Sequence, residues 1–99
     1  MPLCGGTGEE RDATPEVQNI CDEVKPHAEE KAGKQFDTFT AVKYSSQVVA
    51  GTNYFIKVHV GEEEYMHLRV HKSLPHDGSK RTLHSIQSAK TKHDPIGHF

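Results

Sequence analysis

The chain has 99 residues, of which 33% are hydrophobic and 26% are charged, so it allows one polar domain with a single small core. The formal net charge is -2 and the basic residues are dispersed, which argues against a nucleic acid or an anionic membrane surface as the partner. Residues 1–6 lack the basic and apolar regions of a signal peptide, and no stretch has the length of a membrane span, so we expect an intracellular, soluble protein.

Residues 1–12 are predicted to form a flexible N-terminal arm, because three glycines are followed by four charged residues and little of this segment can be buried. The chain has two cysteines, whereas small secreted domains usually carry several disulfides, so we expect two free thiols. Cys4 lies on the arm, where it is accessible for pairing with a second chain. Cys21 falls on the apolar side of the predicted helix, where it would be a small core residue.

An amphipathic helix is predicted to follow the arm. Thr14 is placed to cap its N-terminus, Pro15 fits its first turn, and Gly33 is placed to end it. Apolar residues at spacings of three and four form one stripe: Val17, Ile20, Cys21, Val24, Ala28 and Ala32. Pro26 removes one backbone hydrogen bond within this pattern, so we expect a kink there with the helix resuming beyond it. Two separate helices are the alternative.

After Gly33 the pattern changes to that of β-strands. The predicted strands are 36–46, 52–60, 66–71 and 81–89. In the first of them the alternation changes phase, so a β-bulge is expected near Ala41. Each strand has a single core-facing side, and the alternate residues are expected to face solvent.

One helix followed by four antiparallel strands indicates an α+β fold in which the helix packs on the sheet. In such a meander the loops 47–51 and 73–79 lie at the same end, which the arm could also reach as an edge strand. The first loop is unusual, because a hairpin tip normally contains Gly, Asn, Asp or Pro, whereas Val48 and Val49 are apolar. Each exposed valine would forgo roughly 1.5 to 3 kcal/mol relative to burial, so a partner is expected to bury them. The alternative is an ordinary hairpin with tolerated surface valines.

Three motifs stand in order along the chain: Gln47 to Gly51, the run from Thr52 to Gly61, and Leu74, Pro75 and His76. With these motifs the chain resembles the stefins, the type 1 cystatins, over essentially its whole length. The resemblance implies a single cystatin domain over residues 1–99, with an antiparallel sheet wrapped around one long α-helix. It also implies a cytoplasmic protein, with the nucleus as a further compartment, that has no disulfide, no cofactor and no enzymatic activity.

The resemblance further implies a reversible, tight-binding inhibitor of papain-like cysteine proteases such as cathepsins, which blocks the active-site cleft sterically. Three segments would enter the cleft together: Leu3, Cys4, Gly5 and Gly6 of the arm, Gln47, Val48, Val49, Ala50 and Gly51 of the first hairpin, and Leu74, Pro75 and His76 of the later loop. A glycine at position 5 lets the backbone pass close to the protease nucleophile. No catalytic or metal-binding residue is implied.

Eight histidines invite a metal-binding interpretation. His59, His67 and His71 share a predicted strand face, but residues four apart on one strand are about 13 Å apart, so only a cross-strand pair with His59 could share a zinc ion. We expect the histidines instead to lie on solvated strand faces and to gain charge below about pH 6.5.

Two further alternatives concern catalysis and self-association. A catalytic interpretation would need Cys4 or Cys21 beside a positioned histidine, which a mobile arm and a core position do not favour. In the self-association alternative, the hairpin 47–51 straightens, two chains form a domain-swapped homodimer and the inhibitory surface disappears.

Overall fold

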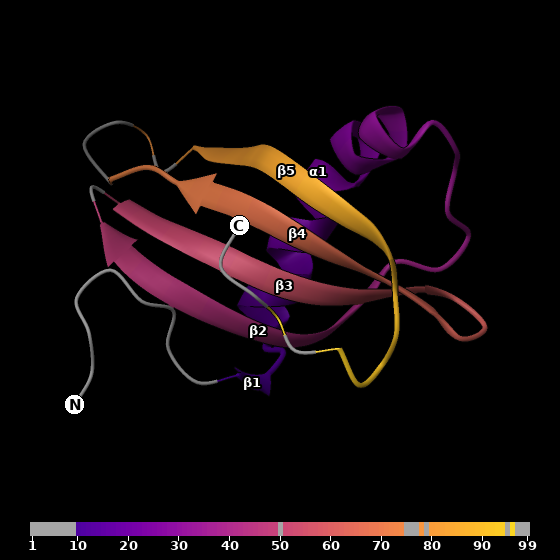
Figure 1. Cartoon of the computed structure of the whole chain (residues 1–99). Helices are drawn as coiled ribbons and strands as arrows, with labels where there is room; N and C mark the ends of the chain where they lie inside the picture. Colours follow the sequence, from indigo (N-terminus) through magenta and orange to yellow (C-terminus); the bar gives the residue numbers. More distant parts are fainter. Residues whose placement is uncertain (1–9, 50, 75–77, 79, 95, 97–99) are drawn as a thin grey trace.

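The computed structural model describes residues 10–49, 51–74, 78, 80–94 and 96, with only the backbone described at position 49. Within these residues the elements are, in chain order, β1 (Arg11–Asp12), α1 (Pro15–Ala32), β2 (Thr40–Val49), β3 (Gly51–Gly61), β4 (Glu64–Lys72) and β5 (Arg81–Lys90). The strands form one antiparallel sheet in the order β1-β2-β3-β4-β5, and α1 lies across one face of it (Figure 1). The α+β class expected from the sequence is therefore confirmed.

The helix α1 begins and ends where the sequence predicts. The Thr14 hydroxyl accepts a hydrogen bond from the Val17 N–H at 3.2 Å, which satisfies one of the free donors of the first turn. Gly33 follows the last turn in the left-handed conformation, with a φ of 76°, and its N–H donates to the Glu29 carbonyl. The helix runs through Pro26 as one element, so the alternative of two separate helices is wrong.

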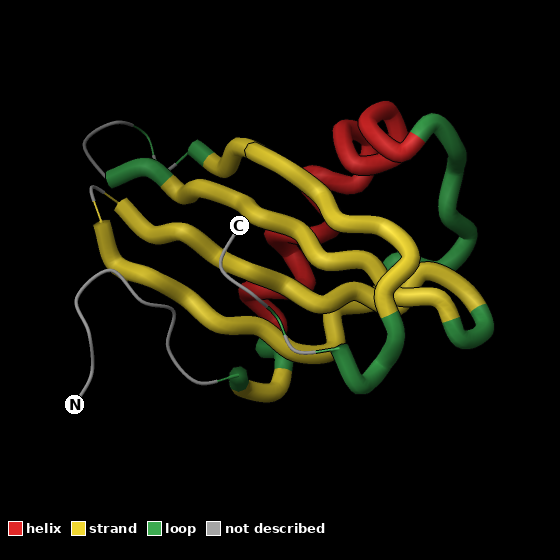
Figure 2. The backbone as a smooth tube through the Cα atoms, viewed as in Figure 1, coloured by secondary structure: helices red, strands yellow, loops and turns green. Residues whose placement is uncertain are grey.

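The main core lies between α1 and the sheet (Figure 2). The apolar stripe of the helix is buried as predicted, at Val17, Ile20, Cys21, Val24 and Ala28. It packs with alternate residues of β3 and β4, namely Ile56, Val58, Met66, Leu68 and Val70. Leu83 of β5 joins the same cluster, so three strands contribute to a single layer of side chains under the helix.

The first long strand starts later than predicted. The strand β2 covers Thr40–Val49, whereas the sequence pattern indicated 36–46. Phe36 and Phe39 precede the strand, and both rings are buried in the core with 5.8 Å between their centroids. The β propensity of aromatic residues reflects how well large side chains pack, and here the connection after α1 provides that packing without a strand.

The predicted bulge in β2 is confirmed by a register shift against β3 between Ala41 and Lys43. The Gln18 side chain of α1 satisfies backbone groups at this interruption. Its carboxamide oxygen accepts from the Ala41 N–H at 2.8 Å, and its NH₂ group donates to the Phe39 carbonyl at 3.2 Å. One helix side chain thus completes two backbone hydrogen bonds where the strand begins.

Arg11 and Asp12, the last two residues of the predicted arm, form the edge strand β1, an arrangement that the meander allows for the arm. In β1, Arg11 pairs with Tyr44 and Asp12 with Lys43. A hydrogen bond from the Lys43 ammonium, which lies 2.5 Å from the Asp12 carboxylate, lowers the pKa of that carboxyl. Pairing at a sheet edge depends on the neighbouring strand, which the composition of a charged segment does not reveal. Residues 1–9 lie outside the described residues.

The outer face of the sheet, on the side away from α1, differs from the prediction. We expected solvated side chains there, but Phe55, Lys57 and His67 expose at most 3% of their surfaces. Residues 91–94 and 96, which we call the C-terminal strap, lie over part of this face (Figure 1). The predictions that each strand has one core-facing side and that His67 is solvated are therefore wrong.

Two hydrogen bonds attach the C-terminal strap. The Lys57 ammonium of β3 donates to the Lys92 carbonyl at 2.7 Å. The Ile96 N–H donates to the carboxylate of Glu10, the residue before β1, at 2.9 Å, and the Ile96 side chain is buried. The alternation of a strand shows which side chains point away from the helix, but it does not show what covers them, so this second buried layer was missed.

We expect Phe55→Ala to lower the free energy of unfolding by about 3 to 5 kcal/mol, the usual cost of truncating a fully buried phenylalanine. Urea-induced unfolding measures the change. The control is Thr82→Ala, because Thr82 of β5 lies on the same outer face of the sheet but is exposed to solvent. The control should stay within about 0.5 kcal/mol of the parent. A loss at Phe55 as small as that of the control would contradict a buried outer face.

Candidate functional site

The first hairpin is tighter than the predicted loop 47–51. The strand β2 continues to Val49, β3 begins at Gly51, and Val48 pairs with Thr52. Most residues of the predicted loop are therefore strand residues. Gly51 has a φ of 102°, a conformation that residues with side chains rarely adopt, and this glycine allows the second strand to begin at the tip itself.

Gly51 also lies against the end of β4. A Cβ atom at this position would stand 2.3 Å from the Lys72 carbonyl oxygen and 3.2 Å from the Ser73 Cα. The next residue, Thr52, pairs with Lys72 in the sheet. The tip of the first hairpin is therefore in contact with the start of the second predicted loop, and both lie at one end of the sheet, on the left in Figure 1, as the meander predicts.

The side chains at this end differ in exposure. Val48 is 83% exposed, and it is the single large apolar side chain with such exposure in the described part of the chain. Leu74 is half-buried, directly after the residue that touches Gly51. Gln47 is buried, and its side-chain oxygen accepts from the Asn53 amide at 3.4 Å, so it supports the tip from within the sheet.

The structure thus brings Gln47, Val48 and Gly51 together in one hairpin with Leu74 beside it. For Val49 the backbone alone is described, and it pairs with Gly51. The remaining predicted contact residues lie outside the described residues: Leu3, Cys4, Gly5, Gly6, Ala50, Pro75 and His76.

Residues that the sequence analysis did not single out hold the second loop. The Ser73 N–H donates to the Lys80 carbonyl at 2.8 Å, and the Lys80 N–H donates to the Ser73 hydroxyl at 2.7 Å. These reciprocal bonds close the base of the loop. The turn-rich composition between positions 73 and 79 indicated a loop, but the closing partner at Lys80 depends on the pairing of β4 with β5.

Two ion pairs connect the same end of the sheet to the helix. The Lys72 ammonium lies 3.1 Å from the Glu16 carboxylate, and the Arg81 guanidinium contacts the Glu23 carboxylate. Lys72 and Arg81 are neighbours across β4 and β5. Since all four side chains are partly exposed, each pair contributes only about 0 to 1 kcal/mol and chiefly orients the strand ends against α1.

The one cysteine among the described residues is not a reactive nucleophile. Cys21 is fully buried, and burial, with the neighbouring Asp22 carboxylate, raises the pKa of its thiol to about 12. The thiol is therefore neutral at physiological pH and closed to substrates. In the same part of the chain no three His, Cys, Asp or Glu side chains gather to hold a metal ion. The His59 ring instead lies 2.7 Å from the Glu62 carbonyl.

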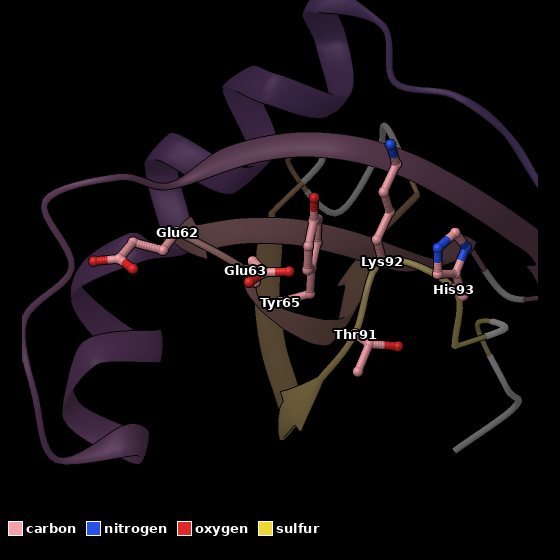
Figure 3. A pocket seen from close by; sticks show the side chains of 6 residues that line it. All are labelled: Glu62, Glu63, Tyr65, Thr91, Lys92 and His93. Carbon is pink, nitrogen blue, oxygen red and sulfur yellow. The ribbon is translucent and has the colours of Figure 1, made fainter.

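A cavity of about 360 Å³ opens at the opposite end of the sheet from the hairpin tip, beside the turn that joins β3 to β4 (Figure 3). Its lining is polar and comes from that turn, from β4 and from the C-terminal strap: Glu62, Glu63, Tyr65, Thr91, Lys92 and His93. None of the predicted contact residues lines it. The candidate site is thus the protruding end of a sheet and not a pocket.

Known proteins resemble this chain over most of its length. Residues 5–93 match the model of the cystatin domain. The chain belongs to the cystatin family. This cystatin is 54% identical over 97 residues to Cystatin-B of Paralichthys olivaceus, with 98% of this chain and 99% of the relative covered. It is 53% identical to Cystatin-B of Oplegnathus fasciatus, covering 98% and 97% of the two chains, and 52% identical to Cystatin-B of Homo sapiens, covering 98% and 99%.

The cystatin family consists of cysteine protease inhibitors and not of enzymes. No helix within the described residues is both long enough and apolar enough to cross a lipid bilayer.

Gly51→Ala should destabilise this cystatin more than Gly33→Ala does. Both glycines have positive φ angles, so an alanine at either position costs roughly 1 to 2 kcal/mol in backbone conformation. Around Gly33 an added Cβ meets nothing within 4 Å, whereas at Gly51 it meets the Lys72 carbonyl at 2.3 Å. Urea unfolding of both variants separates the two effects. Equal losses would contradict the contact between the tip and β4.

Cys21 should be unreactive toward a thiol reagent such as Ellman's reagent while the protein is folded. The raised pKa and the burial of the thiol leave almost no accessible thiolate at about pH 8. The measurement uses a Cys4→Ser variant, so that Cys21 is the remaining thiol, with the same protein in denaturant as the positive control. Labelling of the folded variant as fast as that of the unfolded one would contradict the core position.

Proposed function

We propose that the protein is a reversible, tight-binding inhibitor of papain-like cysteine proteases, cathepsins among them, and that it acts by filling the active-site cleft. Membership of the cystatin family supports the class of target. The observation that carries the mode of binding is the exposed Val48 at the hairpin tip. The chain has few apolar residues, yet the Val48 side chain is exposed to water at the end of the sheet, where a partner can bury it.

The energetics favour a docking role for the tip. Burying an exposed valine contributes roughly 1.5 to 3 kcal/mol, and Leu74, which lies beside the tip, is only partly buried. The tip is also held in place, because Gly51 packs directly on the Lys72 carbonyl. A preformed, rigid wedge loses little conformational entropy when it binds, which raises the affinity for a given buried area.

The proposed wedge has three parts. The tip with Gln47 to Gly51 forms its middle, Leu74, Pro75 and His76 form one flank, and Leu3, Cys4, Gly5 and Gly6 form the other. In the cleft, Gly5 would allow close approach to the protease nucleophile, and Leu3 and Cys4 would occupy apolar subsites. About 800 Å² per partner would suit three such segments. Inhibition is steric, since no peptide bond need be presented for attack. The proposed compartment is the cytoplasm, with the nucleus as a second one.

Val48→Asp should raise the inhibition constant for papain at least tenfold, because it places a charge in the apolar centre of the interface. The matched control is Thr40→Asp, which adds the same charge at an exposed, β-branched position at the other end of the same strand. The control should inhibit like the parent. Enzyme assays at several inhibitor concentrations give both constants, and circular dichroism verifies that both variants are folded.

Equal inhibition constants for Val48→Asp and Thr40→Asp would contradict the wedge. The self-association alternative uses the same hairpin as a hinge, and it predicts a different pattern. Size-exclusion chromatography with an inhibition assay on each peak separates the two, since the wedge requires the inhibitory activity to elute with the monomer. Activity confined to a dimer peak would exclude the proposed monomeric inhibitor.

A further inference from the structure

Outside the proposed wedge, the most unusual side-chain environment is that of His67 in β4. Its side chain is fully buried on the outer face of the sheet, and within the described residues neither ring nitrogen has a hydrogen-bond partner. Buried polar groups are normally paired, because an unpaired one loses its hydrogen bonds to water without replacement. Burial favours the neutral form of an unpaired imidazole, whereas an uncovered imidazole is hydrated and takes up a proton as the pH falls below about 6.5.

The charged groups that act on His67 come from several segments around it. They are Lys57 of β3, Lys90 of β5, Asp94 of the C-terminal strap and Glu10 before β1. On its own strand the histidine is flanked by Tyr65 and Arg69. Burial lowers the pKa of His67 most, the two lysines lower it further, and the two carboxylates act in the opposite direction, which leaves it at about 4. The covered site therefore resists a second positive charge.

Lys57 connects this histidine to the strap. It is the cross-strand partner of His67, it is itself 3% exposed, and its ammonium donates to the Lys92 carbonyl at 2.7 Å. Protonation of His67 would put two cations side by side in a site closed to water, where their repulsion is poorly screened. Lifting the strap relieves this repulsion, because water then reaches both charges. The Lys57 hydrogen bond to Lys92 is the contact that such opening breaks.

We propose that the C-terminal strap is a pH-sensitive cover, which lifts from the outer face of the sheet when His67 takes up a proton. The covered state holds His67 neutral, and the open state holds it protonated. This device does not depend on the proposed inhibitory function, since it lies on the outer face and involves none of the wedge residues.

The direction of the pH dependence follows from proton binding. The pKa of His67 falls from 6.5 in an open, solvated state to about 4 in the covered state, so the open state binds more protons between these values. The covered state is therefore fully favoured above pH 6.5 and loses its advantage as the pH falls toward 4. The opening constant should rise by just under tenfold per pH unit in the middle of this interval, and by roughly 300-fold in all between pH values well above 6.5 and well below 4.

Amide hydrogen exchange by NMR tests the proposal on the full chain. The Ile96 amide reports on the strap, because it donates to the Glu10 carboxylate when the strap is closed. After correction for the intrinsic exchange rate, its protection factor should fall by roughly 40-fold between about pH 6.5 and about pH 4.5. In His67→Gln, which cannot take up a proton, protection should be independent of pH over this range. A wild-type protection factor that does not change would overturn the proposal.

Two controls isolate His67. Glu10→Gln replaces the carboxylate at the Ile96 contact with an amide, and His84→Gln removes an exposed histidine of β5. Both should keep the pH dependence of the parent. Persistence of that dependence in His67→Gln, or its loss in His84→Gln, would overturn the proposal.

The wild-type protein supplies a second measurement that needs no folded His67 variant. The ring proton signals of His67 should titrate with a midpoint well below the ordinary value of 6.5, in step with a shift of the Ile96 amide. A midpoint near 6.5, or a low midpoint without any change at Ile96, would refute the pH-sensitive cover.

Discussion

The packing of the α1 stripe on the sheet is the contact on which the rest of the structure depends. Ile20 and Val24 of the helix share one buried cluster with Ile56 and Leu68 of the central strands. The strand ends that carry the hairpin tip are held by further contacts, within the sheet and to the helix. Gly51 packs on β4, and Lys72 and Arg81 pair with helix carboxylates. These contacts fix the edge of the sheet that carries the apolar side chain of Val48.

Local signals made much of this fold predictable from the sequence. The Thr14 cap, the Gly33 terminus and the bulge near Ala41 each depend on residues within a few positions, so their patterns can be read directly. The start of β2 was missed, because Phe36 and Phe39 have strand propensity but pack in a connection. Tertiary context decided that case, as it does wherever propensity and packing compete.

Prediction from the sequence is limited in the same way for the outer face of the sheet and for the candidate site, because distant contacts determine both. Strand alternation put His67 and Lys57 on the side away from the helix, but the strap that covers them is distant in sequence and carries no periodic signal. Likewise, Val48 was recognised as apolar in the wrong place for a turn, while the contact of Gly51 with Lys72 follows from the register of β3 on β4. The apolar tip could be recognised from its own residues, the other contact segments followed from the resemblance to the stefins, and register determines how the tip is held.

Titration of active papain with the purified protein tests the central claim most directly. The inhibitory wedge predicts that activity falls linearly and reaches its minimum at an equimolar ratio, and that mass spectrometry finds the inhibitor uncleaved after it is recovered from the complex. Steric filling of the cleft requires both results. Full papain activity in the presence of excess protein, or cleavage of the chain near its hairpin tip, would contradict the account.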